Sequence, residues 1–193
     1  MKKKIVTLLA VLAVGTASLA RAEPPADPTT YTVVLAGGSE QNTMHIWLTS
    51  DGYSYVIDSA VPLEVGGTVC GHPPENPNQL ICEAPPVTGF VVIGGTRDDT
   101  VTVARSVQVP LTMKGGAGKD TLLGGSGSDL VIGGPGGARL AGRAGDDVVY
   151  AGPGDDVVWG GAGDDVLRGG PGRDALHGGA GVNVTDESPA QAS

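Results

Sequence analysis

Residues 115–186 consist of eight nine-residue units with no gaps between them. In order they read GGAGKDTLL (115–123), GGSGSDLVI (124–132), GGPGGARLA (133–141), GRAGDDVVY (142–150), AGPGDDVVW (151–159), GGAGDDVLR (160–168), GGPGRDALH (169–177) and GGAGVNVTD (178–186). The shared pattern is Gly-Gly-x-Gly-x-Asp-x-apolar-x. Its eighth position holds Leu122, Val131, Leu140, Val149, Val158, Leu167, Leu176 and Thr185, aliphatic in seven of eight units. A flexible glycine linker, the alternative interpretation, needs no such column, so the pattern favours stacked repeats.

The first six positions of each unit suit a tight turn that holds a cation. Glycine permits the positive φ that such a turn needs, and it lets carbonyl oxygens approach an ion without a Cβ in the way. The aspartate at the sixth position adds a carboxylate, and calcium prefers carboxylate and carbonyl oxygens. The last three positions predict a short strand whose middle side chain points inward.

This nonapeptide resembles that of the hemolysin-type calcium-binding, or repeats-in-toxin (RTX), family. The resemblance implies an all-β fold: a right-handed parallel β-roll, or β-solenoid, in which unit n stacks on unit n+2. It also implies Ca²⁺ as the cofactor, bound between stacked turns. The metal-ligating residues carried over in this way are Asp120, Asp156 and Asp174 on one side of the roll, and Asp129, Asp147, Asp165 and Asn183 on the other.

The two columns are not uniform. Both stacked turns supply an aspartate in three pairs, which are Asp156/Asp174, Asp129/Asp147 and Asp147/Asp165. Ala138 interrupts the first column, so we expect no ion beside it, and Asn183 predicts a weaker site. The acids at the fifth position, Asp146, Asp155 and Asp164, either enlarge the negative field or are solvated surface charges.

Calcium should be required for folding of the repeats. The carboxylates repel one another, and one aliphatic residue in nine cannot offset a backbone entropy cost of about 1–2 kcal/mol per residue. Metal binding is then coupled to folding.

The roll is expected to begin before the regular repeats, at residue 94. The segment Gly94–Thr102 (GGTRDDTVT) fits the pattern except that Arg97 replaces the fourth glycine. Val103–Leu111 reads as a further unit without turn glycines, followed by a three-residue insertion, Thr112–Lys114. These first rungs should be poor in metal, because terminal repeats are commonly atypical.

Residues 31–93 predict a small, irregular cap of short strands. Tyr31–Leu35, Thr43–Thr49 and Tyr53–Ile57 are rich in β-branched and aromatic residues, and Asp51-Gly52 between the last two favours a hairpin. Cys70 and Cys82 are the two cysteines of the chain, and we expect them to form a disulfide. A metal site that uses both cysteines and His72 is the alternative.

The ends of the chain predict export. Residues 1–22 have a basic start, an apolar run of signal-peptide length and Ala20-Arg21-Ala22 as a cleavage site. Residues 23–30 form a proline-rich linker and residues 187–193 a short disordered tail. We therefore expect a secreted, extracellular protein that uses the general secretory route, with the periplasm as the other destination. A transmembrane anchor is the alternative, but the apolar run is short for one.

Charge and motifs limit the functions that remain. The chain of 193 residues carries a formal charge of −9, which disfavours nucleic acid and attracts cations. It contains no His-Glu-x-x-His and no Gly-x-Ser-x-Gly, so the zinc-protease and lipase signatures are absent. We expect a calcium-binding protein with a structural or binding role and no catalytic residues. The partner is unknown, and no membrane span is expected in the mature chain. The alternatives are an adhesion module that uses residues 31–90, with Trp47, Tyr53 and Tyr55, and a hydrolase of unrecognised type.

Overall fold

The computed structural model describes residues 10–13, 31–37, 39–50, 52, 54–59, 70–71, 73–83 and 87–186. The predicted linker (23–30), the predicted tail (187–193) and most of the predicted signal peptide (1–22) lie outside these residues. All regular structure within the described ranges is β, and no helix there is long and apolar enough to cross a membrane.

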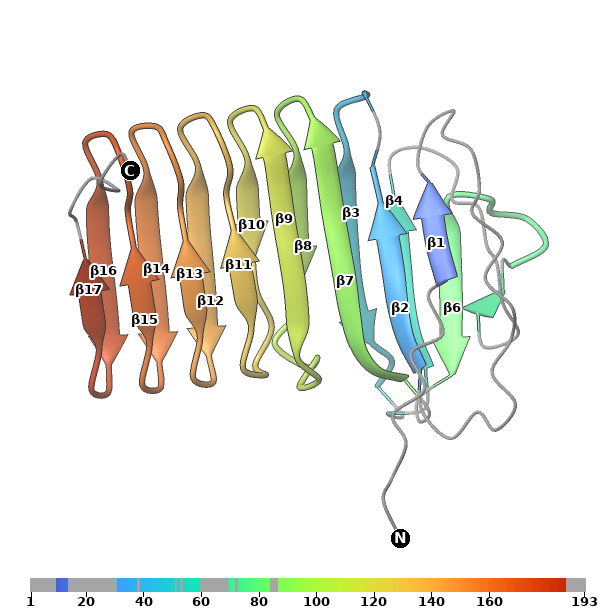
Figure 1. Cartoon of the computed structure of the whole chain (residues 1–193). Coiled ribbons are helices and arrows are strands. Elements are labelled where there is room, and N and C mark those ends of the chain that lie inside the picture. Colours follow the sequence, from blue (N-terminus) through green and yellow to red (C-terminus); the bar gives the residue numbers. More distant parts are fainter. Residues whose placement is uncertain are drawn as a thin grey trace, which may run out of the picture.

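The strands form two sheets that face each other along the length of the molecule (Figure 1). The first sheet contains, in spatial order, β1 (Ala10–Ala13), β2 (Tyr31–Ala36), β7 (Val87–Thr96), β9 (Leu111–Ala117), β11 (Leu130–Ile132), β13 (Val148–Tyr150), β15 (Val166–Arg168) and β17 (Val184–Asp186). The second contains β16 (Ala175–Ala180), β14 (Val157–Ala162), β12 (Arg139–Ala144), β10 (Thr121–Leu123), β8 (Thr100–Val103), β3 (Thr43–Leu48), β4 (Ser54–Ser59), β6 (Gln79–Glu83) and β5 (Cys70–Gly71).

The repeats stack in parallel with the predicted register. Leu122 of β10 pairs with Leu140 of β12, and Val131 of β11 pairs with Val149 of β13, so each unit lies on the unit two positions along the chain. Successive strands alternate between the sheets, and two units therefore complete one coil. These pairings confirm the parallel β-solenoid.

The apolar eighth position forms the core of the roll. Its side chains from Leu122 to Leu167 are completely buried, because both sheets turn this position toward the interior. Burial decreases at the final coil, where Leu176 is only partly covered and Thr185 is exposed. At the other end the same core continues without interruption into larger side chains such as Met113 and Phe90.

The predicted cap shares both sheets with the roll. Strand β2 pairs in parallel with β7, and β3 pairs in parallel with β8, so these two strands form one more coil. The predicted hairpin is confirmed, since β3 pairs antiparallel with β4. Strands β6 and β5 then extend the second sheet antiparallel to β4. Within the predicted signal peptide, β1 pairs in parallel with the outer edge of β2.

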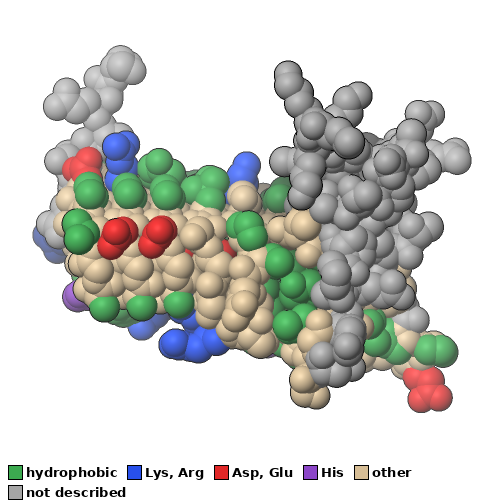
Figure 2. All heavy atoms as spheres, turned by 90° about the horizontal axis from the view of Figure 1, so that it is seen from below, with side chains coloured by type: hydrophobic (Ala, Val, Ile, Leu, Met, Phe, Trp, Pro, Cys, Tyr) green, Lys and Arg blue, Asp and Glu red, His purple; other side chains and the backbone are tan. Residues whose placement is uncertain are grey.

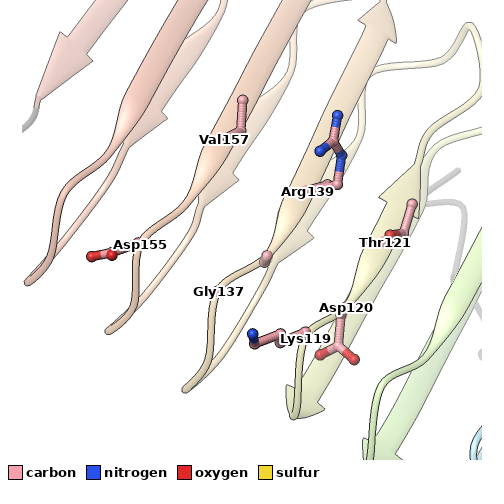
Figure 3. A pocket seen from close by; sticks show the side chains of 8 residues that line it. Lys119, Asp120, Thr121, Gly137, Arg139, Asp155 and Val157 are labelled. Atoms are coloured by element: carbon pink, nitrogen blue, oxygen red, sulfur yellow. The ribbon is translucent and has the colours of Figure 1, made fainter.

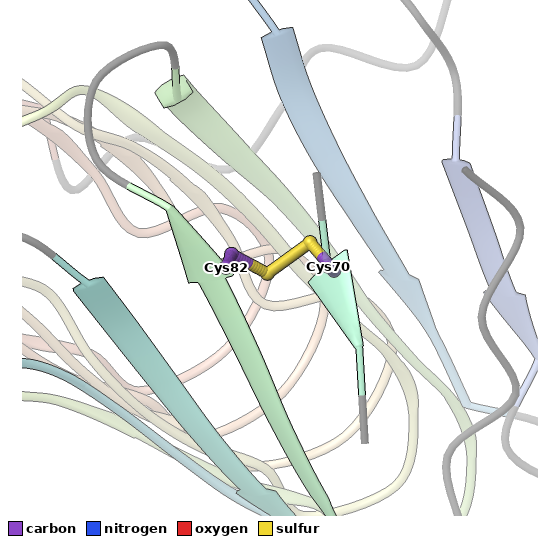
Figure 4. The surroundings of a disulfide bond; sticks show 2 residues. All are labelled: Cys70 and Cys82. Atoms are coloured by element: carbon purple, nitrogen blue, oxygen red, sulfur yellow. A yellow bond between two sulfur atoms is a disulfide. The ribbon is translucent and has the colours of Figure 1, made fainter. Parts of the chain in front are cut away.

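The cysteines lie opposite each other on two antiparallel strands. Cys70 of β5 pairs with Cys82 of β6, and the two sulfurs form a disulfide (Figure 4). The fully buried side chain of Cys82 contributes to the core. The bond thus ties the outermost strand of the second sheet to its neighbour.

The predicted position of one insertion is wrong. Met113 pairs with Val131, so Thr112–Lys114 is the strand triplet of its unit, with Met113 pointing inward, and is not an insertion after the unit. The extra residues lie instead in the preceding loop, 104–110. Pro110 would otherwise occupy the centre of a paired strand, where its missing N–H would break the ladder.

Candidate calcium-binding turns

The turns between the sheets form two columns at opposite edges of the roll. We call the turns that follow the first sheet the first turn column; its regular members are 115–120, 133–138, 151–156 and 169–174, and the degenerate turn 94–99 precedes them. We call the turns that follow the second sheet the second turn column, with members 124–129, 142–147, 160–165 and 178–183. Figure 2 shows one edge of the roll, where acidic side chains lie in a row between rows of apolar ones.

The sixth-position side chains connect successive rungs by a ladder of hydrogen bonds. In each case a backbone N–H donates to the Oδ1 of the residue one rung further along. In the second column the N–H of Asp129 donates to Asp147, that of Asp147 to Asp165, and that of Asp165 to Asn183, at 2.8, 2.9 and 2.9 Å. In the first column Asp156 donates to Asp174 at 3.0 Å. One carboxylate oxygen of each aspartate is thereby fixed.

The other carboxylate oxygen has no such partner. Within the described part of the chain, the buried Oδ2 atoms of six aspartates accept no hydrogen bond: Asp99, Asp120, Asp147, Asp156, Asp165 and Asp174. A buried carboxylate oxygen without a donor is costly. Six such atoms at equivalent positions therefore indicate a cation that compensates for them, and oxygen ligands of this kind suit calcium.

Glycine serves two separate purposes in these turns. A Cβ on Gly160, at the first position, would lie 2.3 Å from Oδ2 of Asp165 and 2.5 Å from the carbonyl oxygen of Gly178. The glycine therefore leaves room for a carboxylate and a carbonyl oxygen to converge. Gly161 and Gly163, at the second and fourth positions, have φ of +127° and +135°, which glycine adopts without strain.

Burial makes the carboxylates hold protons strongly. Desolvation, followed by repulsion from Asp129, Asp165 and Asp146, raises the pKa of Asp147 to about 7. Desolvation likewise raises the pKa of Asp129 to about 6. The pKa values of Asp120, Asp156 and Asp165 are also raised, mainly by burial. The folded turns therefore disfavour ionised carboxylates when no cation is bound.

Asp129 differs from the other aspartates. Its Oδ1 accepts the N–H of Leu111 and its Oδ2 accepts the N–H of Gly125, both at 3.0 Å. Its turn lies on the loop 104–110, which lacks turn glycines, and Gly125 and Gly127 do not adopt positive φ. Both oxygens of Asp129 are thus hydrogen-bonded, although its unit, GGSGSDLVI, matches the consensus.

Arg143 lies next to this unusual turn. It has a φ of +87°, an uncommon value for a residue other than glycine. Its half-buried guanidinium donates hydrogen bonds to the carbonyl oxygens of Val103 and of Gly124, the latter at 2.9 Å. The positively charged side chain of Arg143 therefore connects three successive rungs by hydrogen bonds at the start of the second turn column.

The fifth-position acids form a second ladder that runs in the opposite direction. The N–H of Asp164 donates to Oδ1 of Asp146, and the N–H of Arg173 donates to Oδ1 of Asp155, at 2.9 and 3.0 Å. Asp164 accepts the N–H of Val182 in the same way, at 2.8 Å. These exposed acids are therefore more than solvated charges, because each one connects its own rung to the next.

An open pocket of about 450 Å³ lies beside the interruption at Ala138 (Figure 3). Gly137 and Ala138 supply no carboxylate at the fifth and sixth positions, so the rung between Asp120 and Asp155 lacks both ladder acceptors. Lys119 lines this pocket from the preceding rung, and Arg139 lines it from the interrupted rung itself. The backbone N–H of Ala138 still donates to Asp156, at 2.6 Å, so the coil itself is preserved.

The turns bring together pairs of carboxylates and not larger clusters. No group of three or more His, Cys, Asp or Glu side chains in the described ranges is arranged to hold a metal. An ion would therefore need backbone carbonyl oxygens in addition, as the glycine geometry allows. Asn183 contributes less, since its Oδ1 accepts the N–H of Asp165 and its Nδ2 donates to Gly179.

Two residues of the first column were not predicted from the sequence. Asp99 has an unpartnered Oδ2, and Asn42, one rung earlier, donates its N–H to Oδ1 of Asp99 at 2.6 Å. The nine-residue pattern could have indicated both residues. Residues 37–45 read GGSEQNTMH and residues 94–102 read GGTRDDTVT, with Met44 and Val101 buried at the eighth position.

Stacked parallel coils whose turns present buried, unpartnered carboxylate oxygens define a calcium-binding β-roll. Residues 112–138, 132–167 and 154–184 match the model of the RTX calcium-binding nonapeptide repeat (four copies). The tract 112–184 thus belongs to the RTX family of repeats, which bind calcium ions. Comparison with curated proteins and with solved structures found no match.

Proposed function

We propose that this protein is a secreted calcium-binding β-roll whose repeats fold when they meet calcium outside the cytoplasm. Its role is structural or binding, and it carries no catalytic site. The observation that carries this proposal is the set of six buried carboxylate oxygens without a hydrogen-bond donor. The proposed ligands are Asp120, Asp129, Asp147, Asp156, Asp165, Asp174 and Asn183. Asp129 and Asn183 are the weakest, because both polar atoms of each of these two side chains are already hydrogen-bonded.

The coupling of folding to calcium follows from the composition of the core. Six of the eight regular units bury one branched aliphatic side chain completely, while burial raises the pKa of Asp147 to about 7. Ionised carboxylates at neutral pH therefore oppose folding until a cation neutralises them. Calcium binds the folded turns and not the extended chain, so its binding free energy becomes folding free energy.

Export is supported by two independent features. Residues 1–22 have the three parts of a secretory signal. The disulfide between Cys70 and Cys82 is typical of an oxidising compartment. A fusion of residues 1–22 to a reporter enzyme that is active only after export tests this part, and an inactive reporter would contradict it.

The adhesion alternative receives less support. Tyr55, one of its three aromatic residues, is buried and packs edge-on against Phe90, with ring centroids 5.1 Å apart. It therefore belongs to the core of the cap. Trp47 is half-buried on β3, and Tyr53 lies outside the described residues. We accordingly propose residues 31–93 as a cap on the roll formed by residues 94–186.

The hydrolase alternative also lacks support. His45 is exposed on β3 and His177 is exposed on β16, and these strands lie far apart in the order of the second sheet. His177 stacks on Trp159, with ring centroids 5.9 Å apart, as an outward cross-strand pair. His72 lies outside the described residues.

Circular dichroism of the chain during a calcium titration tests the proposal. We expect β signal to rise with calcium and to fall again with a chelator. Isothermal titration calorimetry should give three or four strong sites in the regular repeats. A β-rich spectrum that a chelator leaves unchanged would contradict calcium-coupled folding.

A further inference from the structure

The first turn column continues beyond the regular repeats into the cap. Thr43 pairs with Thr100, and Thr100 pairs with Thr121, so the residues before them, Asn42, Asp99 and Asp120, occupy equivalent positions on three successive rungs. Of these three residues, only Asp120 lies within the tract that matches the family model. Asn42 comes from a segment separated from Asp99 by the antiparallel strands β4, β5 and β6.

These three side chains are fixed by the same ladder as the regular repeats. Besides the contact from Asn42, the N–H of Asp99 donates to Oδ1 of Asp120 at 2.8 Å. The Nδ2 of Asn42 donates to the carbonyl oxygen of Gly94 at 2.9 Å and to Oδ1 of Asp99 at 3.0 Å. Asn42 is therefore held in one orientation by the turn of Asp99.

Three oxygens remain without partners in this fully buried group. Asn42 is 0% exposed, and Asp99 and Asp120 are each 1% exposed. Nevertheless, Oδ1 of Asn42 and the Oδ2 atoms of both aspartates accept no hydrogen bond from the described residues. The charged side chains that act most strongly on the two carboxylates are acidic, namely Asp98 and, for Asp120, Asp99 itself. Two buried carboxylates thus each keep one oxygen without a hydrogen-bond donor, next to further acidic side chains.

Backbone carbonyl oxygens approach the same place. A Cβ on Gly94 would lie 2.6 Å from Oδ2 of Asp99 and 2.4 Å from the carbonyl oxygen of Gly115. A Cβ on Gly115 would lie 2.2 Å from Oδ2 of Asp120. Carboxylate and carbonyl oxygens therefore converge over two stacked glycines, and such oxygens are the ligands that calcium prefers.

We propose that Asp99 and Asp120, with backbone carbonyl oxygens of their turns and with Asn42 beside them, bind a calcium ion at the junction between the cap and the roll. The inference rests on the proposed calcium-binding function and extends it to a rung that the repeat pattern marks as degenerate. The ion holds the turns 94–99 and 115–120 together, and Asn42 couples it to β3. Calcium then orders the cap as well as the repeats.

Hydrogen exchange of the wild-type chain, with and without calcium chloride, tests this site. We expect calcium to slow exchange in residues 39–44 and 94–100 as well as in residues 142–174. If the repeats respond and residues 39–44 and 94–100 do not, the junction site is refuted and the proposed function stands. If no segment responds, the proposed function fails as well.

A matched pair of variants provides a second readout. Asp99→Asn removes one buried charge and keeps an oxygen for the N–H of Asn42, whereas Asp98→Asn removes the neighbouring exposed charge. We expect Asp99→Asn to bind one calcium ion fewer than the wild type in calorimetry, and Asp98→Asn to bind the same number. Equal stoichiometry in Asp99→Asn and the wild type would overturn the inference.

Discussion

At the scale of single residues, a buried aspartate in this fold has opposite effects with and without calcium. Asp147 is completely buried and lies between Asp129 and Asp165 in the second turn column. Its charge attracts an ion, but the same charge is desolvated and repelled by its neighbours when no ion is bound. The stabilising or destabilising effect of the residue therefore depends on the calcium concentration.

Asp147→Asn should reverse its effect on stability when calcium is added. Without calcium the variant should be more folded than the wild type, because a buried charge has been removed. With calcium it should be less stable and bind with roughly tenfold weaker affinity, equivalent to about 1.4 kcal/mol. Circular dichroism and calorimetry measure the two effects. The control Asp146→Asn, at an exposed neighbour, keeps an oxygen for the N–H of Asp164. It should change both quantities much less than Asp147→Asn does. A loss of stability in Asp147→Asn in both conditions would contradict this account of Asp147.

Arg143 combines an unfavourable backbone conformation with favourable side-chain contacts. Arg143→Gly removes the hydrogen bonds to Val103 and Gly124, and we expect it to lower the free energy of unfolding by about 1–3 kcal/mol. Arg143→Ala loses the same bonds but keeps a Cβ at positive φ, so it should be about 1 kcal/mol less stable than the glycine variant. Urea unfolding in saturating calcium measures both values. A glycine variant more stable than the wild type would show that the guanidinium contributes nothing.

At the scale of the turn and its strand, the hydrogen bonding of a turn depends on the segment on which it stacks as much as on its own sequence. The turn 124–129 matches the consensus, yet Asp129 is hydrogen-bonded at both oxygens because its turn stacks on the loop 104–110.

Outward side chains also pair between rungs. Arg139 lies over the ring of Trp159 at 5.7 Å, and Arg168 lies over the ring of Tyr150 at 5.9 Å.

The interrupted rung can be used to test the proposed ligands. Ala138→Asp places a carboxylate between Asp120 and Asp156, where the ladder now lacks one, and should add at least one bound calcium ion in calorimetry. It should raise the midpoint of thermal unfolding in calcium and lower it without calcium. Ala138→Asn has nearly the same shape without the charge and should add no strong site. If the aspartate variant binds no additional calcium, sixth-position carboxylates do not define the sites.

The regular repeats could be predicted from the sequence because their chemistry is local. The fixed nine-residue spacing predicts which apolar side chains point inward and which units stack on each other, and the pairing of Leu122 with Leu140 confirms this stacking. The turn of Asn42 was missed because a long segment, residues 46–93, separates its unit from Gly94–Thr102 and contains the antiparallel strands β4, β5 and β6. The state of Asp129 was missed because it depends on the loop beneath its turn, and the sequence of its own unit does not reveal that loop.

At the scale of the whole molecule, the raised pKa values predict how pH affects the calcium-free chain. Asp147 and Asp129 have pKa values of about 7 and about 6 in the folded state, above the ordinary value of 3.8. Between pH 3.8 and about pH 7 the folded chain binds more protons than the unfolded chain, so the stability of the folded chain falls as the pH rises. The calcium-free chain should therefore show more β signal at pH 5 than at pH 7.5.

Saturating calcium should reverse that dependence, because protons compete with calcium for the same carboxylates. The calcium-loaded chain should lose stability as the pH falls from 7.5 to 5. Thermal unfolding followed by circular dichroism at both pH values measures the two trends. A calcium-free spectrum that does not change over this range would contradict the raised pKa values.

The two ladders of hydrogen bonds also determine how the molecule should respond to force. Each coil is held to the next by contacts between residues 18 positions apart, and the two ladders run in opposite directions. A pull on the two ends in an optical trap should therefore detach one coil at a time. Each release frees 18 residues, which extend to about 60 Å at most, so the force–extension curve in calcium should show regular steps no longer than this. The roll would then lengthen in discrete steps under load, and the calcium concentration would set the force at which each step occurs.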